Sequence, residues 1–213
     1  EYCDRAVARK ELEWCRSIQL RLPVHDPDRW NEPSLLTPLL AALELLTGDS
    51  WSIEFVARSS PADTPQQSTL GFLSNVSAVL PYSDGLDSRA VGGLLDAEAR
   101  GRLVRIRLGS VGSSRNRDRM QPFERVPYEV VVEGGTKESS GRSRGFKFAM
   151  IASVGAYLTH APRIIFPESA QGALGPVLVP VGQAHADYRN HPQFTVLMGR
   201  FVKQLFGHDV AFD

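Results

Sequence analysis

Hydrophobic and polar positions change their period several times along the chain, and these changes predict its elements. Residues 14–24 and 51–58 alternate apolar and polar side chains, which is typical of half-buried strands. Between them, residues 34–49 carry a dense run of leucine and alanine that predicts a helix, with Ser34 or Asn31 as its N-cap. The first part of the chain therefore predicts a small α+β module.

The second part alternates short apolar strands with helices. Strands are predicted at residues 76–82, 102–109, 126–133 and 163–169, and helices at residues 86–100, 145–161 and 191–207. This alternation favours an α/β fold with a largely parallel sheet covered by helices. Ligands of such sheets bind beyond the carboxyl ends of the strands, so we look for function in the loops there. These loops follow residues 82, 108, 132 and 166.

A stretch rich in Ser, Pro and Gln at residues 59–69 separates the two parts and predicts a surface loop or linker. We therefore expect an α+β module with its linker at residues 1–70 and an α/β domain at residues 71–213. The chain starts at Glu1 rather than at methionine and stops soon after an amphipathic stretch. We therefore allow for a second domain that is truncated at its C-terminus.

Charge and composition exclude several classes of protein. The 24 Lys and Arg residues equal the 24 Asp and Glu residues, so the whole chain has no general affinity for nucleic acid or membrane surfaces. No apolar run reaches the roughly 18 to 20 residues that cross a bilayer, and no secretory signal is evident, so we expect a cytoplasmic protein. Cys3, Cys15 and the five histidines lack the spacing of a zinc site.

The loop at residues 83–88 has the composition of an anion site. It lies between a predicted strand and a predicted helix and reads Ser-Asp-Gly-Leu-Asp-Ser. Backbone N–H groups at the start of a helix carry partial positive charge, and small hydroxyl side chains add donors. The plainer interpretation is a turn at Gly85 and a helix cap at Ser83 or Asp84. The loop has neither the phosphate lysine of G-x-x-x-x-G-K-[ST] nor the spacing of G-x-G-x-x-G.

These six residues resemble the S-G-G-x-D-S loop of the PP-loop ATP pyrophosphatases, here written S-D-G-L-D-S. The resemblance implies an adenine nucleotide α-hydrolase domain with a Rossmann-like fold, which uses Mg²⁺ and ATP. Asp84 replaces a glycine, so a positive φ there would cost on the order of 1 kcal/mol, and its carboxylate repels phosphate unless magnesium or arginine offsets it. The resemblance implies that ATP contacts Ser83, Asp84, Gly85, Leu86, Asp87, Ser88 and Leu108.

Longer stretches resemble one branch of this superfamily, the QueC-like proteins related to 7-cyano-7-deazaguanine synthase. In residues 141–158 an Arg-containing turn opens an apolar helix, and in residues 163–176 a strand leads into a polar loop. Residues 187–207 resemble the Pro-containing turn and the helix that come next. Residues 21–30 and 46–58 resemble the N-terminal module of the QueC-like proteins of phage-defence operons, the QatC family of the Qat system.

The resemblance implies a ligase that adenylates the carboxylate of 7-carboxy-7-deazaguanine and transfers the acyl group to an amine. In the synthase the amine is ammonia, and in a defence operon a partner protein is a plausible donor. The guanidinium fork of arginine fits oxyanions, and a carboxylate fits the paired N–H donors of a deazaguanine. The implied catalytic residues are Asp87, Ser88 and Arg144, and the implied substrate-binding residues are Arg142, Arg144, Glu168, Ser169 and Gln171.

Other interpretations stay open. The arginines also fit a solvated loop, and Glu168 also fits a turn stiffened by Pro167. The synthase family holds a structural zinc near its C-terminus, so we expect zinc here only if a cysteine cluster lies beyond residue 213. A chain whose ATP chemistry is blocked by Asp84 would act as a binding scaffold. Thiolation of tRNA is a weaker alternative, because thiol motifs and a broad basic surface are absent from the sequence.

Overall fold

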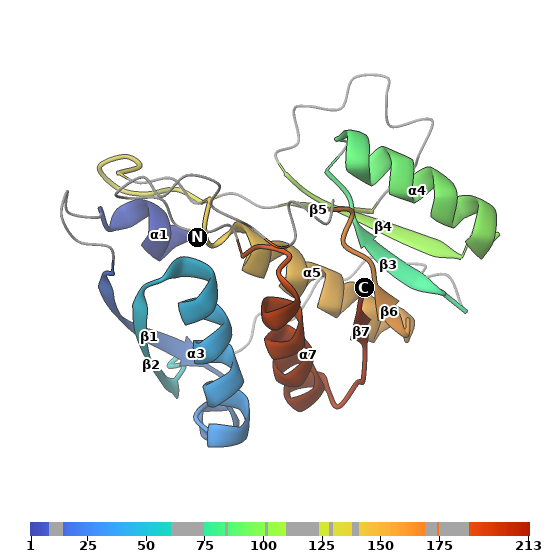
Figure 1. Cartoon of the computed structure of the whole chain (residues 1–213). Helices are drawn as coiled ribbons and strands as arrows, with labels where there is room; N and C mark the ends of the chain where they lie inside the picture. The colour runs from blue at the N-terminus through green and yellow to red at the C-terminus, as the bar shows by residue number, and fades with distance from the viewer. Residues whose placement is uncertain are drawn as a thin grey trace.

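The computed structural model describes residues 1–8, 15–60, 75–83, 85–100, 102–109, 124–127, 130–137, 141–168, 174 and 188–213. The helices are α1 (Tyr2–Ala6), α2 (Pro27–Trp30), α3 (Pro33–Thr47), α4 (Leu86–Ala99), α5 (Arg144–Thr159) and α7 (Pro192–Phe206). The strands are β1 (Ser17–Val24), β2 (Ser50–Ala57), β3 (Ala78–Pro81), β4 (Leu103–Gly109), β5 (Glu124–Pro127), β6 (Arg163–Ile164) and β7 (Ala211–Phe212). The strands form two parallel sheets with helices packed against them, so the α/β class is confirmed (Figure 1).

The N-terminal part is a βαβ unit. Strands β1 and β2 pair in parallel over eight residues each, and α3 is the crossover between them. Both strands follow the period-two pattern of the sequence. Parallel neighbours need a helical crossover, and α3 supplies it. The sequence suggested an α+β module, whereas the parallel pairing makes this part α/β as well.

The start of α3 differs from its sequence prediction. Neither Ser34 nor Asn31 is the N-cap, because α3 begins at Pro33 after Glu32. Proline fits the first helical position, since its missing N–H would have no partner there. The side-chain amide of Asn31 instead donates to the carbonyl oxygen of Phe55 at 2.8 Å and accepts from the N–H of Phe55 at 3.2 Å. Asn31 therefore protects part of the outer edge of β2.

The second sheet has five parallel strands in the order β5-β4-β3-β6-β7. Its first strand in the sequence, β3, is central: the chain moves outward through β4 and β5, then returns to the other side of β3 for β6 and β7. Figure 1 shows α4 on one face of this sheet and α5 and α7 on the other. The strand order reverses between β3 and β6, which is compatible with a Rossmann-like fold.

Two of the predicted strands differ from those observed, and one observed strand was missed. The strand expected at residues 126–133 occurs earlier, as β5, and residues 130–132 are not in a strand. Only the first two residues of the strand expected at 163–169 are β6, because the chain leaves the sheet before Pro167. Strand β7 was not predicted, since two residues are too few to show a period.

The two parts of the chain share one hydrophobic core. Leu39 and Leu46 of α3 and Phe194 and Phe201 of α7 are all at most 5% exposed and belong to the same buried cluster. This cluster continues under α5 to the central strand β3. The linker expected at residues 59–69 lies mostly outside the described residues. Within the described part of the chain, no helix is long and apolar enough to cross a membrane.

Gly155 lets α5 lie close to the sheet. A Cβ atom at this position would be 2.2 Å from Cδ1 of Ile106 and 3.6 Å from Cγ1 of Val79. We expect Gly155→Ala to lower the free energy of unfolding by about 1–3 kcal/mol, because Ile106 must move within a packed core. Urea denaturation followed by circular dichroism measures this change.

Gly199 of α7 is the matched control for Gly155. A Cβ atom there would meet Cδ2 of Phe212 at 3.8 Å, which is an ordinary contact. Gly199→Ala should therefore raise the free energy of unfolding by about 0.5–1 kcal/mol through helix propensity alone. Equal stabilisation by both substitutions would contradict the close packing of α5.

Candidate functional site

A pocket opens at the carboxyl ends of β3 and β6, where the strand order reverses. It encloses about 580 Å³, part of which is open to solvent. Its walls come from the end of β3, the first turns of α5, the residues after β6 and the turn before α7. The lining residues are Pro81, Ser83, Arg144, Gly145, Phe148, Phe166, Pro167, Glu168, Arg189 and Asn190. Ligands of doubly wound sheets bind at this point of the fold.

The pocket brings together three residues that the sequence singled out in separate stretches: Ser83, Arg144 and Glu168. The side-chain Nδ2 of Asn190 donates to Oε2 of Glu168 at 3.0 Å, which fixes the orientation of that carboxylate. Arg189 adds a second guanidinium to the lining. Arginine side chains bind oxyanions, and a carboxylate accepts hydrogen bonds from N–H donors. The pocket can therefore bind a ligand that has an oxyanion and N–H donors.

Close packing at Gly145 places the turn before α7 in the pocket. A Cβ atom on Gly145 would lie 2.8 Å from both Cα and the carbonyl oxygen of Arg189. Glycine therefore allows this turn to lie directly on the first turn of α5. Next to Gly145, the guanidinium carbon of Arg144 is 5.7 Å from the centroid of the Phe148 ring, a cation–π distance. Phe148 thus gives the arginine an aromatic support.

The predicted anion loop joins β3 to α4 at one side of the pocket. Gly85 is the N-cap of α4 in extended conformation, and no side chain within the described residues caps this helix. The N–H of Gly85 donates to Oγ of Ser83 at 3.4 Å, which is a long hydrogen bond. Oγ of Ser88 donates to the carbonyl oxygen of Gly85 at 3.1 Å and lies 3.2 Å from Oγ of Ser83. The first-turn N–H groups of α4 therefore have no side-chain acceptor among these residues.

The other predicted residues that the structure describes are not in the pocket lining. Ser88 is only 1% exposed, and its hydroxyl group bonds to the loop at Gly85. Leu86 and Asp87 are exposed on the first turn of α4. Leu108 lies in β4, where only its backbone is described. Asp84, Ser169 and Gln171 lie outside the described residues.

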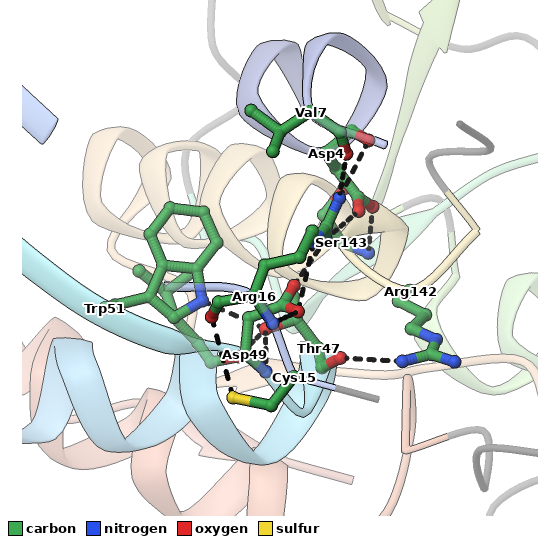
Figure 2. A network of polar contacts seen from close by, with 10 residues as sticks. Asp4, Val7, Cys15, Arg16, Thr47, Asp49, Trp51, Arg142 and Ser143 are labelled. Atoms are coloured by element: carbon green, nitrogen blue, oxygen red, sulfur yellow. Dashed lines mark hydrogen bonds and ion pairs between the residues drawn. The ribbon is translucent and has the colours of Figure 1, made fainter. Parts of the chain in front are cut away.

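Arg142 also lies outside the pocket lining. Its Nη1 donates to the carbonyl oxygen of Thr47 at 3.1 Å, at the end of α3 (Figure 2). Arg142 thus links the N-terminal βαβ unit to the turn before α5. Arg142 and Arg144 therefore have different surroundings, which the sequence could not show.

Sequence reasoning missed Arg189, Asn190, Phe148 and Phe166. Arg189 and Asn190 come just before Pro192, the first residue of α7, and polar residues beside a helix start were a usable signal. In the same turn, Nδ1 of His191 accepts from the N–H of Gln193 at 3.1 Å and caps α7. The two phenylalanines gave no signal that distinguishes them from core residues.

A buried ion cluster holds the start of α5. Arg16 is 6% exposed, and all five of its guanidinium N–H donors are used (Figure 2). Nε and Nη2 bond to the Asp49 carboxylate, and Nη2 also donates to Oδ1 of Asp4 at 2.6 Å. Nη1 donates to the carbonyl oxygens of Asp4 at 3.2 Å and Val7 at 2.6 Å. Two carboxylates and two carbonyls from α1, its C-cap and the α3–β2 loop therefore surround one cation.

The second oxygen of Asp4 connects this cluster to the pocket. Oδ2 of Asp4 accepts from the N–H of Ser143 at 3.3 Å. Ser143 is the N-cap of α5 and makes no side-chain cap of its own, so a negative charge from α1 lies at the positive end of the helix. Glu1 adds a salt bridge of 2.7 Å to Lys147 on the same helix. Helix α1 therefore orients the turn that carries Arg144.

Arg16 carries its positive charge throughout the neutral pH range. Burial alone lowers the pKa of Arg16, but the hydrogen bonds and negative charges of Asp49 and Asp4 outweigh burial and raise this pKa above its usual value. A raised pKa of a base means that its stabilising contribution is present below the unfolded-state pKa and is lost only as the pH rises through the folded-state pKa. Arg16 therefore adds no pH dependence in the neutral range.

Comparisons of the chain with protein-family models, curated proteins and solved structures found no match. No relative therefore supplies a function, and the function is inferred from the geometry of the pocket. Among the described residues, no group of three His, Cys, Asp or Glu side chains is arranged to hold a metal ion.

Replacing Arg16 by methionine would leave Asp4 and Asp49 buried without their counter-charge. We expect Arg16→Met to lower the free energy of unfolding by about 3–5 kcal/mol, measured by urea denaturation. Arg21→Met is the control, because the Arg21–Glu54 pair at 3.3 Å has side chains that are 72% and 65% exposed. Its effect should stay within about 0.5 kcal/mol. Similar effects of the two substitutions would show that the cluster does not support the fold.

Proposed function

We propose that the pocket and the loop before α4 form one site that binds Mg-ATP and a carboxylated deazaguanine. The observation that carries this proposal is the meeting of Ser83, Arg144 and Glu168 at the reversal of the strand order. The sequence resemblance to QueC-like proteins assigned ATP to the first of these residues and the deazaguanine to the other two. Their common location supports that assignment.

The loop at the start of α4 fits a phosphate group. The helix has no side-chain cap among the described residues, and N–H groups at the start of a helix bind anions. The exposed carboxylate of Asp87, on the first turn, suits Mg²⁺, which prefers oxygen ligands and usually binds through one or two carboxylates together with phosphates. The described residues offer no cage for zinc, so the proposal includes no step through zinc.

The opposite wall fits a flat heterocycle with N–H donors. Glu168 is held by Asn190, and a carboxylate in a fixed orientation can accept from two neighbouring donors of a deazaguanine ring. Phe148 and Phe166 supply flat apolar surfaces in the same pocket. Arg144 and Arg189 would then face the carboxylate of the substrate and the phosphates of ATP.

In the proposed reaction, a carboxylate oxygen of 7-carboxy-7-deazaguanine attacks the α-phosphorus of ATP and pyrophosphate leaves. An amine then attacks the acyl carbon of the adenylate, AMP leaves, and the nitrogen loses a proton to form an amide. The two arginines and the start of α4 stabilise the negative charge of the leaving pyrophosphate. Glu168 and the aromatic rings hold the acid in the orientation for attack.

The acceptor is either ammonia, as in the synthase, or an amine of a partner protein from the same operon. The alternative function is a scaffold in an anti-phage complex, in which the loop no longer binds ATP. Binding of Mg-ATP separates these functions. Isothermal titration calorimetry should detect heat for the ligase, whereas neither heat nor thermal stabilisation would support the scaffold.

The direct test measures AMP. We expect the purified protein with Mg-ATP and 7-carboxy-7-deazaguanine to release AMP and pyrophosphate only when both substrates are present, as chromatography can show. Mass spectrometry then identifies the amide formed with ammonia or with candidate operon proteins. Binding of Mg-ATP without any AMP, with each acceptor supplied, would overturn the proposed reaction.

Two arginines give a matched pair of variants. Arg144→Ala should lower the rate of AMP formation by about 100-fold or more, because it removes a positive charge from the pocket. Arg142→Ala should leave that rate within about threefold and lower only the melting temperature, since its hydrogen bond goes to Thr47. The reverse result would mean that the substrates bind outside this pocket.

A further inference from the structure

The turn before α7 presents two side chains to the pocket. The N–H of His191 donates to the carbonyl oxygen of Tyr188 at 3.2 Å, which closes a β-turn around Arg189 and Asn190. Both of these central residues line the pocket, and Asn190 holds Glu168 through a hydrogen bond of 3.0 Å. The position of both pocket residues therefore depends on the residue that closes the turn, His191.

The ring of His191 has a second role at the same place. Its Nδ1 accepts from the N–H of Gln193 at 3.1 Å and caps α7. The first helical residue is Pro192, which has no N–H, and the first turn of α7 contains no acidic residue. The ring also lies edge-on to Tyr188, with 5.3 Å between the ring centroids and an interplanar angle of 89°. One imidazole thus joins the start of the helix to the start of the turn.

The hydrogen bond to Gln193 requires a neutral ring. Nδ1 accepts only when it carries no proton, so the neutral ring has its proton on Nε2. An imidazolium is a donor at both nitrogens, and its positive charge at the start of a helix is opposed by the helix dipole. At this residue the folded state therefore binds fewer protons than the unfolded state. The contribution of the cap to stability is present at high pH and is lost as the pH falls.

The surrounding charges do not replace this bond. The side chains that can carry a charge in the turn and in the elements around it are those of Tyr188, Arg189, Arg144 at the start of α5 and Glu168 after β6. Among the described residues, none of them forms a hydrogen bond with the ring of His191. The two arginines repel an added positive charge, and Glu168 attracts one. The cap on α7 therefore remains the interaction that protonation breaks.

We propose that His191 is a pH-sensitive positioning residue of the pocket. The neutral ring caps α7 and holds Arg189 and Asn190 at the pocket wall. Protonation breaks the cap and loosens the turn, so Glu168 loses its fixed partner and the affinity of the pocket falls at mildly acidic pH. Imidazole changes its charge between about pH 5 and 8, which sets the range to measure. The effect on ligand binding rests on the proposed function, whereas the effect on the turn does not.

NMR spectroscopy of the protein without ligand tests the effect on the turn. At about pH 8 the ring of His191 should be the tautomer with its proton on Nε2. As the pH falls to about 5, the backbone N–H of Gln193 and the side-chain N–H signals of Asn190 should shift with the same midpoint as the His191 ring. Asn190 signals that do not follow this midpoint overturn the proposal.

Replacement of His191 by asparagine separates capping from titration. The side-chain oxygen of asparagine is a good N-cap acceptor and does not titrate in this range. In His191→Asn, the Asn190 signals should therefore be independent of pH. A shift that persists in this variant comes from another group, such as Glu168, and overturns the proposal. His25→Asn is the matched control, because His25 is exposed in the loop between β1 and α2 and should not affect the pH dependence.

The stability of the chain gives a second readout. His191→Ala removes the cap, so its melting temperature should lie about 2–4 °C below that of the native chain at about pH 8. At about pH 5 the native cap is lost as well, so the variant should reach or exceed the native melting temperature. An equal loss at both pH values would mean that the role of His191 is independent of its protonation, contrary to the proposal.

Binding of 7-carboxy-7-deazaguanine measures the consequence for the pocket. From about pH 8 to about pH 5, the affinity of the native chain should fall about 3- to 10-fold more than that of His191→Asn. Comparison of the two proteins removes the titration of the ligand itself, which affects both. A ratio that stays constant, or that favours the native chain at low pH, overturns the proposal. If neither protein binds the acid at any pH, the proposed function fails, and the NMR shifts still decide the role of His191.

Discussion

The ion cluster around Arg16 is the constraint on which the arrangement of this protein depends. A guanidinium buried to 6% exposure is tolerated only where its N–H donors are all paired, and those partners come from α1, its C-cap and the α3–β2 loop. The same Asp4 carboxylate that neutralises Arg16 accepts from the backbone of Ser143. A charge buried in the N-terminal part thus fixes where α5 begins, and Arg144 is the first residue of that helix.

Much of the fold could be predicted because periodicity shows which face of an element is buried. The eight-residue strands β1 and β2, the helix α4 and the central strand β3 all follow from alternation or helical spacing. The end of β6 and the whole of β7 could not be found in this way, because two residues have no period and their pairing depends on neighbours far away in the sequence. The role of Asn31 at the edge of β2 was hidden for the same reason.

The sequence pointed to pocket residues where they lie beside a strand end or a helix start, and it missed those whose position depends on tertiary packing. Ser83, Arg144 and Glu168 each follow a strand or open a helix, so their residue types were informative. Arg142 differs from Arg144 only in what surrounds it, and no pattern in the sequence reveals its bond to Thr47. Likewise, the contribution of Arg189 depends on the absence of a side chain at Gly145, which is a tertiary contact.

These contacts make the N-terminal part a support for the pocket rather than an independent module. One wall, at α5, is oriented by Asp4 and Glu1, and the opposite turn at Arg189 lies on Gly145 of the same helix. Helix α7, which follows that turn, shares its core with α3. Because both walls are fixed through residues of the first 50 positions, removal of that part would expose the core of α7 and release the start of α5 together. The pocket and the βαβ unit therefore form a single cooperative structure.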